Sequence, residues 1–173
     1  MNIGTKTKES IPLLAAQASK GDEESFVLLC DILKMQLFRT AKGILNNDTL
    51  ALCAVDEAVY KAYKGIGRLR KPEYAATWFM RILINAANDI YRQNKLETSL
   101  SSLPEEAYNE DYSKLNFDQL ISFLPLNLRH IISLKYYSQY TLAEISDILK
   151  IPAGTVKSRL NKALKLLRLE VKE

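Results

Sequence analysis

Basic and small polar side chains are concentrated near the C-terminus of this 173-residue chain. Between Ile151 and Arg168 there is no acidic residue, and apolar residues recur at the spacing of one helix face. The opposite face of this predicted helix carries Lys157, Ser158, Asn161, Lys162, Lys165 and Arg168. A basic helix face is usually a solvated surface when acids and bases alternate, but here they do not alternate. We therefore interpret this face as a binding surface for duplex DNA.

The residues before this helix predict the element that holds it in place. Thr141 is a good helix N-cap, and Glu144 three residues later completes a capping box for a short helix. A tight turn over 150–154 follows, with Lys150 where a left-handed glycine is often found. The last helix is then expected to begin at Thr155 as its N-cap. Two helices joined in this way form a helix-turn-helix.

The docking geometry of helix-turn-helix motifs assigns roles within the last helix. The N-terminal part of the second helix enters the major groove, where side chains reach base edges. The base-edge candidates are therefore Lys157, Ser158, Asn161 and Lys162. Phosphate contacts position a protein without reading sequence, and the candidates for them are Arg159, Lys165 and Arg168.

A second segment interleaves basic and aromatic residues. The basic members are Arg68, Arg70, Lys71, Arg81, Arg92 and Lys95, and the aromatic members are Tyr74, Trp78, Phe79 and Tyr91. Bases of single-stranded DNA stack on aromatic rings while a basic groove follows the backbone. Trp78 and Phe79 are adjacent and cannot share a helix face, so at least one of them is expected in the core.

The elements that must position these residues are all helical. Leu, Ala, Lys and Glu are common, Gly and Pro are scarce, and no alternating strand pattern is convincing. The predicted helices cover 11–19, 24–45, 49–66, 75–93, 117–123, 126–137, 141–149 and 155–171. Residues 94–115 are rich in Ser, Glu and Asp without a sustained period. We therefore expect an all-α chain with two small helical domains, 1–95 and 116–173, joined by a flexible linker over 96–115.

Several function classes receive no support from the sequence. Cys30 and Cys53 lie in apolar helical patterns and are interpreted as buried small hydrophobes, and the single histidine, His130, as a surface or core-edge residue. No metal-ligand spacing, Gly-rich phosphate loop or nucleophile–base pair is present, so we expect no enzyme activity, catalytic residue, metal or cofactor. No apolar run is long enough for a membrane span, and the N-terminus lacks the features of a signal peptide. We therefore expect a cytoplasmic protein.

Three stretches of the chain resemble bacterial sigma factors of the extracytoplasmic-function type. Residues 77–92, TWFMRILINAANDIYR, resemble sigma region two, and 15–26 are similar to the opening helix of that family. Residues 123–125, FLP, and 140–160, YTLAEISDILKIPAGTVKSRL, look like region four. The block 151–160 is the most specific piece, and the matches follow the family's order along nearly the whole chain.

The resemblance implies a subunit that binds core RNA polymerase and directs it to promoter DNA. Region four would read the minus-thirty-five element as duplex, through Thr155, Lys157, Ser158, Arg159, Asn161, Lys162, Lys165 and Arg168. Region two would capture the minus-ten element as a single strand, through Arg68, Arg70, Lys71, Tyr74, Arg81, Asn85, Asp89 and Arg92. The polymerase contact would fall on Asp56, Glu57, Tyr60, Lys61 and Tyr63. The resemblance also implies an anti-sigma factor as a partner.

One departure from the family pattern concerns the expected polymerase contact. The family usually has a run of acids before Asp56, where this chain has LALCAV over 50–55, and Tyr63 replaces a common tryptophan. Two alternatives to a sigma factor follow. One is a helix-turn-helix transcriptional regulator, which leaves the basic–aromatic segment unexplained. The other is a sigma-like interaction protein that does not itself initiate transcription.

Overall fold

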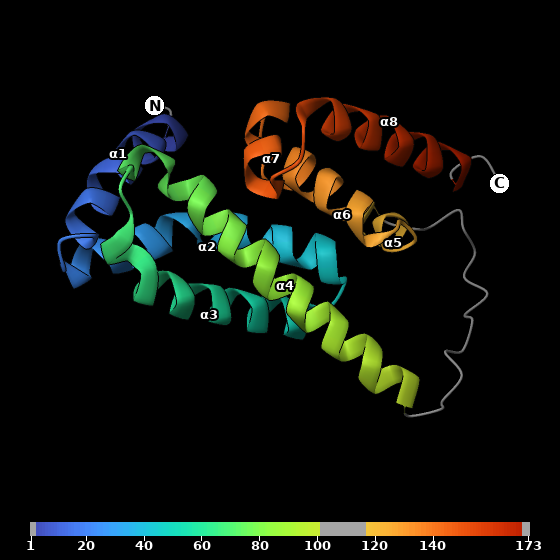
Figure 1. The fold of residues 1–173 in the computed structure, drawn as a ribbon, viewed down its shortest axis with the longest axis horizontal. Helices are drawn as coiled ribbons and strands as arrows, with labels where there is room; N and C mark the ends of the chain where they lie inside the picture. Colours follow the sequence, from blue (N-terminus) through green and yellow to red (C-terminus); the bar gives the residue numbers. More distant parts are fainter. Residues whose placement is uncertain (1–2, 101–116, 171–173) are drawn as a thin grey trace.

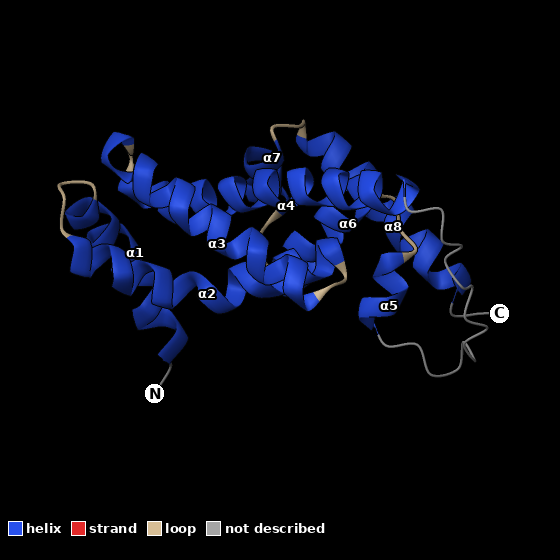
Figure 2. Cartoon of the chain, turned by 90° about the horizontal axis from the view of Figure 1, so that it is seen from below, coloured by secondary structure: helices blue, strands red, loops and turns tan. Residues whose placement is uncertain are grey.

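The computed structural model describes residues 3–100 and 117–170, and every element in these ranges is a helix or a helical turn. Figure 2 shows them as helices joined by short loops. The elements of the N-terminal half are α1 (Ile3–Ala18), α2 (Glu23–Leu45), α3 (Asp48–Gly65), the 3-10 turns η1 (Ile66–Arg68) and η2 (Pro72–Tyr74), and α4 (Ala75–Leu100). The elements of the C-terminal half are α5 (Phe117–Ser122), α6 (Leu126–Ile132), the π turn η4 (Ser133–Tyr137), α7 (Leu142–Leu149) and α8 (Ala153–Glu170). The expected all-α fold is confirmed.

Side-chain caps set the ends of several helices. The Asp22 side chain accepts a hydrogen bond from the Ser25 amide at the start of α2, and Asn47 caps α3 in the same way. The predicted capping box at Thr141 is present, with the Glu144 carboxylate accepting a bond from the Thr141 amide. Lys150 ends α7 in the left-handed conformation, with φ of 56°. Such a residue costs about 1–2 kcal/mol relative to the right-handed region, so the turn is held by its surroundings.

Three predicted helix boundaries were wrong. Helix α1 begins at Ile3 and not at Ile11. Helix α8 begins at Ala153, so Thr155 lies in its first turn and is not its N-cap. The Thr155 and Val156 amides both donate to the Pro152 carbonyl, which starts the helix one turn earlier. Helix α4 continues past Gln93 to Leu100, into the segment expected to be a linker. The rest of that segment, 101–116, lies outside the described residues.

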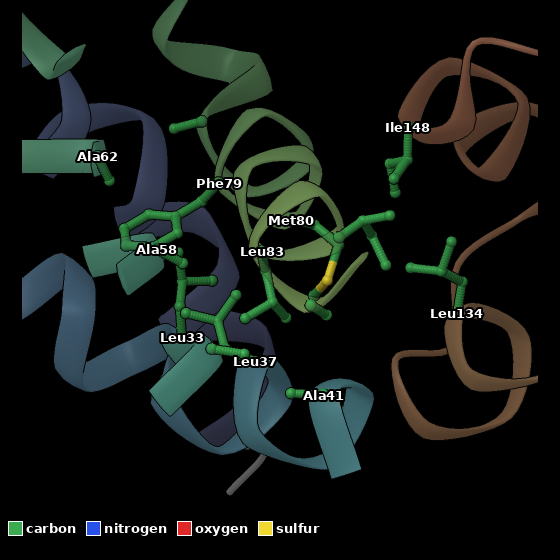
Figure 3. Packing of buried hydrophobic residues seen from close by; sticks show 14 of the residues in the cluster. Leu33, Leu37, Ala41, Ala58, Ala62, Phe79, Met80, Leu83, Leu134 and Ile148 are labelled. Carbon is green, nitrogen blue, oxygen red and sulfur yellow. The ribbon is translucent and has the colours of Figure 1, made fainter. Parts of the chain in front are cut away.

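A seam of alanines brings α3 close to its neighbours. Ala51, Ala54, Ala58 and Ala62 are fully buried, and α3 packs mainly against α2 and α4. Phe79 of α4 fills the space above this seam, with its ring 6.5 Å from that of Phe26 (Figure 3). Small side chains permit this close helix approach, and the large ring then fills the core to the density of a protein interior.

The hydrophobic core of the N-terminal half continues into the C-terminal half. Met80 of α4 belongs to one buried cluster with Leu134 and Ile148 (Figure 3), and Ile131, Ile145 and Val156 are members of it as well. A second, smaller cluster is formed by Ile121, Leu124, Leu128, Ile132, Ala163 and Leu167 within the C-terminal half. The two halves therefore pack directly on each other through α2, α4, α6, η4 and α7 (Figure 1).

Polar contacts reinforce this packing at its edges. The Arg129 guanidinium donates to the carbonyls of Leu124 and Ser122 in its own half and to that of Ile44 in α2, and it stacks on the Tyr91 ring. The Gln36 amide of α2 donates to the Ser138 carbonyl at 3.1 Å. Gly43 gives the closest approach, because a Cβ there would lie 2.5 Å from the Tyr137 ring.

No helix among the described residues is long and apolar enough to cross a membrane.

Candidate nucleic-acid interface

Helix α8 presents a continuous polar face to solvent. Lys157, Ser158, Asn161, Lys162, Lys165 and Arg168 are all exposed, while Val156, Ala163 and Leu167 are buried on the opposite side. The helix packs against α5, α6 and α7 and lies on the side of the C-terminal half that is remote from α2 (Figure 1). The Ser158 hydroxyl donates to the Thr155 carbonyl at 3.0 Å, which leaves its oxygen free to accept another bond. The helix-turn-helix thus places four base-edge candidates on one accessible surface.

Arg159 points away from that surface. Its side chain is partly buried and lines a cavity beneath α7, together with His130. His130 is more deeply buried than a surface residue and lies at the core edge. Burial, with added repulsion from Arg159 and Arg129, lowers the pKa of His130 to about 4. Arg159 is therefore separated from the two other phosphate candidates, Lys165 and Arg168, which are exposed.

The basic–aromatic segment folds into a hollow at the start of α4. Its walls carry Arg68, Arg70, Lys71, Tyr74 and Arg81, and its volume is about 520 Å³. Tyr74 is 53% exposed, so its ring is available for stacking. The Lys71 ammonium lies 5.8 Å from the centre of that ring. Aromatic and cationic groups at this spacing can hold an unpaired base and its phosphate.

The two adjacent aromatic residues of α4 divide as predicted. Phe79 is fully buried in the core, whereas Trp78 is partly buried and lines the hollow. The Trp78 ring packs against Gly65, where an added Cβ would lie 3.3 Å from it. Trp78 therefore connects the floor of the hollow to α3.

The structure separates the remaining minus-ten candidates from this hollow. Asn85, Asp89 and Arg92 follow further along α4, and Asn85 lines the cavity beneath α7 instead. Arg92 and Asp89 form a weak, exposed ion pair at 3.8 Å. Five of the eight candidates therefore meet in one hollow, and the other three extend from it along α4.

The C-terminal half completes the rim of the hollow, which the residue pattern did not predict. Asp147 and Lys150 at the end of α7 line it, and the Arg81 guanidinium donates to the Asp147 carbonyl at 2.8 Å. Arg81 and Asp147 are far apart in the sequence, so no local sequence pattern predicts their contact.

A separate apolar hollow lies between α2 and α3. It has a volume of about 450 Å³ and is lined by Glu23, Phe26, Val27, Asp56, Val59, Tyr60 and Tyr63. The Tyr63 hydroxyl donates to the Glu23 carboxylate at 2.9 Å, which raises the pKa of Tyr63. Three of the five polymerase candidates, Asp56, Tyr60 and Tyr63, line this hollow. Val27 was not among the predicted site residues. Its place outside the apolar face predicted for α2 was the signal that could have identified it, and its side chain is 59% exposed.

The other two polymerase candidates lie beside this hollow. Glu57 and Lys61 are exposed and form an ion pair with each other at 3.1 Å. Leu52 is 55% exposed on the same helix. Cys53 is also exposed, so its predicted burial was wrong, because the alanine seam occupies the buried face of α3. Cys30 is half-buried, and burial raises its pKa to about 11.

Comparisons with known proteins identify a matching family model and similar proteins. Residues 120–169 match the family model of sigma-70, region 4. The ECF RNA polymerase sigma factor SigW of Bacillus subtilis (strain 168) is 30% identical, over 91% of this chain and 94% of its own. The RNA polymerase sigma factor SigV of the same organism is 29% identical, over 80% of this chain and 86% of its own.

Two solved structures have a similar fold. One is CnrH in complex with the cytosolic domain of CnrY, with a TM-score of 0.74 and 20% identity, covering 94% of this chain and 97% of that one. The other is the sigma factor RpoE in complex with the anti-sigma factor NepR from Bartonella quintana. It has a TM-score of 0.65 and 20% identity, covering 82% of this chain and 94% of that one. The identity to SigW over almost the full length of both chains shows the family: this chain belongs to the ECF RNA polymerase sigma factors.

Proposed function

We propose that this protein binds core RNA polymerase and directs promoter-specific transcription initiation. The observation that carries the proposal is the presence of two chemically different DNA-binding surfaces on one chain. One is the exposed basic face of α8, and the other is the basic–aromatic hollow at the start of α4. A protein that opens a promoter needs both, because it must recognise duplex DNA and retain an unpaired strand. The family is one of transcription initiation factors and not of enzymes.

The face of α8 would read the minus-thirty-five element. Lys157, Ser158, Asn161 and Lys162 are exposed near the N-terminal end of the helix, where base edges are reached in the major groove. Lys165 and Arg168 lie further along and would neutralise phosphates. Thr155 is partly buried. Arg159 is partly buried in the cavity between the two halves, so its contribution would require the halves to separate.

The hollow at the start of α4 would hold the minus-ten element as a single strand. Tyr74 offers an exposed ring, and Arg68, Arg70, Lys71 and Arg81 surround it with positive charge. Stacking contributes about 1–3 kcal/mol per base and tolerates any base, while the cations track the backbone. Asn85, Asp89 and Arg92 would extend this contact along α4.

The hollow between α2 and α3 would contact the polymerase. It combines apolar walls from Val27 and Val59 with the exposed rings of Tyr60 and Tyr63. Aromatic side chains in an apolar depression are typical of the centre of a protein–protein interface. Asp56, Glu57 and Lys61 would form its polar rim. Leu52 and Cys53 make this contact more apolar than the family pattern predicts.

The domain division and the remaining partners are also proposals. Residues 1–100, to the end of α4, would form the minus-ten domain and 116–173 the minus-thirty-five domain, with the linker between them. We further propose an anti-sigma factor as a partner and a cytoplasmic location. The sigma factor RpoE, which has a similar fold, is in complex with the anti-sigma factor NepR, and this likeness supports the partner by analogy.

Transcription in vitro tests the proposal. The purified chain is added to core RNA polymerase on a library of genomic fragments from its host. We expect transcripts that begin at discrete sites and share two sequence elements upstream. Core polymerase alone is the control, and the absence of any promoter-specific initiation would refute the proposal.

The apolar stretch over 50–55 favours a second candidate function, a sigma-like protein that sequesters a partner without initiating transcription. Co-purification separates the two functions. A chain that fails to co-purify with core polymerase, yet binds another protein through the hollow between α2 and α3, would support the second. A Tyr60→Ala variant is the matched test of that surface.

A further inference from the structure

A cavity lies where the two halves of the chain meet, beneath α7. Its volume is about 330 Å³, near the lower end of the roughly 300–1,000 Å³ range of ligand pockets. The polar residues in its lining come from α4, α6, the end of α7 and α8: Arg81, Asn85, Asn88, His130, Lys150 and Arg159. The cavity therefore exists only while the two halves are packed together.

The charge of this lining is entirely positive. Arg81, Lys150 and Arg159 contribute three cations, and no carboxylate residue within 3–100 or 117–170 lines the cavity. Among the described residues, none of the three takes part in an ion pair. Like charges confined in a partly buried space repel each other, because the protein interior screens them less than water does. An anion in the cavity would convert this repulsion into attraction.

Three buried polar atoms at the same place lack a hydrogen-bond partner among the described residues. They are Arg81 Nε, Asn88 Oδ1 and His130 Nε2. Buried polar atoms are nearly always paired in native proteins, and three of the five unpaired ones among the described residues belong to side chains that line this single cavity, which favours a polar ligand there. The amide of Asn88 can also turn its NH₂ group to this position and act as a donor.

The lowered pKa of His130 agrees with a surplus of positive charge around the cavity. Burial is the largest cause that lowers its pKa to about 4, and Arg159 and Arg129 lower it further. Arg81 and Lys150 share the cavity with it from α4 and α7. At neutral pH the imidazole is therefore uncharged, and its Nε2 can donate a hydrogen bond in one tautomer.

We propose that this cavity is a binding site for a phosphate-class oxyanion, which bridges the two halves and stabilises their packed arrangement. A tetrahedral oxyanion presents oxygens in several directions at once, which matches donors arriving from α4, α6 and α8. Guanidinium groups such as those of Arg81 and Arg159 are suited to its geometry and charge. The source is either free inorganic phosphate or the phosphate of a nucleotide.

Binding at this site would oppose promoter capture, and this consequence rests on the proposed function. Arg81 lines both the cavity and the basic–aromatic hollow, and its bond to the Asp147 carbonyl holds α7 at the rim of that hollow. A ligand that binds only the packed form shifts the population towards it. The anion would therefore retain α7 over the minus-ten surface.

The binding test uses the full chain alone, so its outcome is independent of transcription. The single histidine gives one Cε1–H resonance in the proton NMR spectrum, which reports directly on the cavity. We titrate inorganic phosphate, and separately adenosine monophosphate, against sodium chloride at equal ionic strength. Phosphate should raise the pKa of His130 by at least about one unit and raise the melting temperature, because a nearby anion favours the imidazolium.

Two variants with matched controls make the test specific. Arg159→Gln should weaken phosphate binding at least tenfold, whereas Arg168→Gln, on the exposed face of the same helix, should leave it unchanged. Gly43→Leu should also weaken binding at least tenfold, although it substitutes none of the lining residues, because it drives Tyr137 and Ser133 away from α2 and so separates the two halves. Gly154→Leu, which meets no atom within 4 Å, is its control.

The two phosphate sources are separated by their affinities. Binding of adenosine monophosphate that is tighter than that of phosphate assigns a nucleotide, and the reverse assigns the free ion. The proposal is overturned if neither anion shifts the His130 resonance beyond the chloride control. It is also overturned if Arg159→Gln and Arg168→Gln lose binding equally, since that result indicates nonspecific attraction to a basic surface.

Discussion

The two candidate DNA surfaces of this chain differ in how they are built and in how accessible they are. The face of α8 belongs to one helix and is exposed along its length. The basic–aromatic hollow requires η1, η2 and α4, and the end of α7 forms part of its rim. The packed arrangement thus leaves the basic face of α8 exposed, whereas the end of α7 borders the hollow.

This difference suggests an order of events during promoter binding. The exposed residues of α8 would reach duplex DNA without a change in the packing of the two halves. We expect that holding an unpaired strand would be easier if α7 withdrew from the rim of the hollow, which would break the bond between Arg81 and the Asp147 carbonyl. Polymerase binding at the hollow between α2 and α3 would leave the interface between the two halves intact. That hollow is lined by the first turns of α2 and by α3, and α3 is not part of the interface.

The largest expected effect comes from reversing charge on α8. Lys157→Glu combined with Lys162→Glu should reduce promoter-specific transcription at least about a hundredfold, because each lost base contact costs about 1–3 kcal/mol and the new acids repel phosphates. Binding to core polymerase should be unchanged, since α8 is remote from the hollow between α2 and α3. Gel-shift and transcription assays measure these effects, with Lys20→Glu, in the exposed turn after α1, as the control. Normal initiation by the double variant would show that α8 does not read the upstream element.

The pH dependence of stability tests the interface between the halves. The pKa of His130 is about 4 in the folded protein, below the ordinary value of 6.5. Because the unfolded chain binds this proton more readily, the contribution is complete above pH 6.5 and is lost as the pH falls from 6.5 towards 4. The loss should reach at most about 3 kcal/mol, at about 1.4 kcal/mol per pKa unit.

Urea unfolding of the wild type and a His130→Gln variant at about pH 7 and about pH 4.5 measures this contribution. The wild type should lose more stability on acidification than the variant, which has no histidine to protonate. Equal losses would mean that His130 is as solvated in the folded state as in the unfolded state.

Opening the interface should sharpen the contrast between the two DNA surfaces. Gly43→Leu introduces a side chain where even a Cβ would lie 2.5 Å from the Tyr137 ring. Overpacking of this kind costs about 1–3 kcal/mol, which the chain can relieve by separating its halves. We expect a larger radius of gyration by small-angle X-ray scattering and several-fold tighter binding of single-stranded minus-ten DNA. Duplex affinity through α8 should stay within about twofold of the wild type, and a fall in both affinities would indicate misfolding instead.

The smallest effect is expected at the start of α7. Thr141→Ala removes the side-chain half of the capping box and should destabilise the protein by about 1 kcal/mol. Thermal unfolding measures the change. The comparison outside the helix-turn-helix is Thr77→Ala, which removes the hydroxyl that donates to the Tyr74 carbonyl. No change in melting temperature would mean that α7 is held by packing alone.

Local signals were sufficient to predict most of the helices. The capping box at Thr141 and the apolar period of α2 act within one or two turns, so they can be recognised without knowledge of the fold. The start of α8 was misplaced because Pro152 suits a helix N-terminus as well as a turn. The end of α4 was misplaced because the polar residues after Gln93 favour a linker, although no Gly or Pro interrupts the helix there.

The interface between the halves could not be predicted from the same signals. Ile131 and Ile132 are adjacent in α6, and Ile145 and Ile148 lie three residues apart on one face of α7, but helical spacing does not say which domain an apolar residue contacts. In the structure Ile132 packs within the C-terminal half, whereas Ile131 joins the core shared with α4. For the same reason the sequence groups Arg159 with the phosphate contacts, since its cavity is formed only by the packing of both halves.

Mapping of transcription start sites after overexpression of this chain in its host tests the central claim most directly. The wild-type chain should activate a set of start sites that share an upstream duplex element and a minus-ten element at constant spacing. The Lys157→Glu, Lys162→Glu variant should activate none of them at equal abundance. If the wild-type chain activates no start sites, or if the variant activates the same set, this protein is not a two-surface promoter reader.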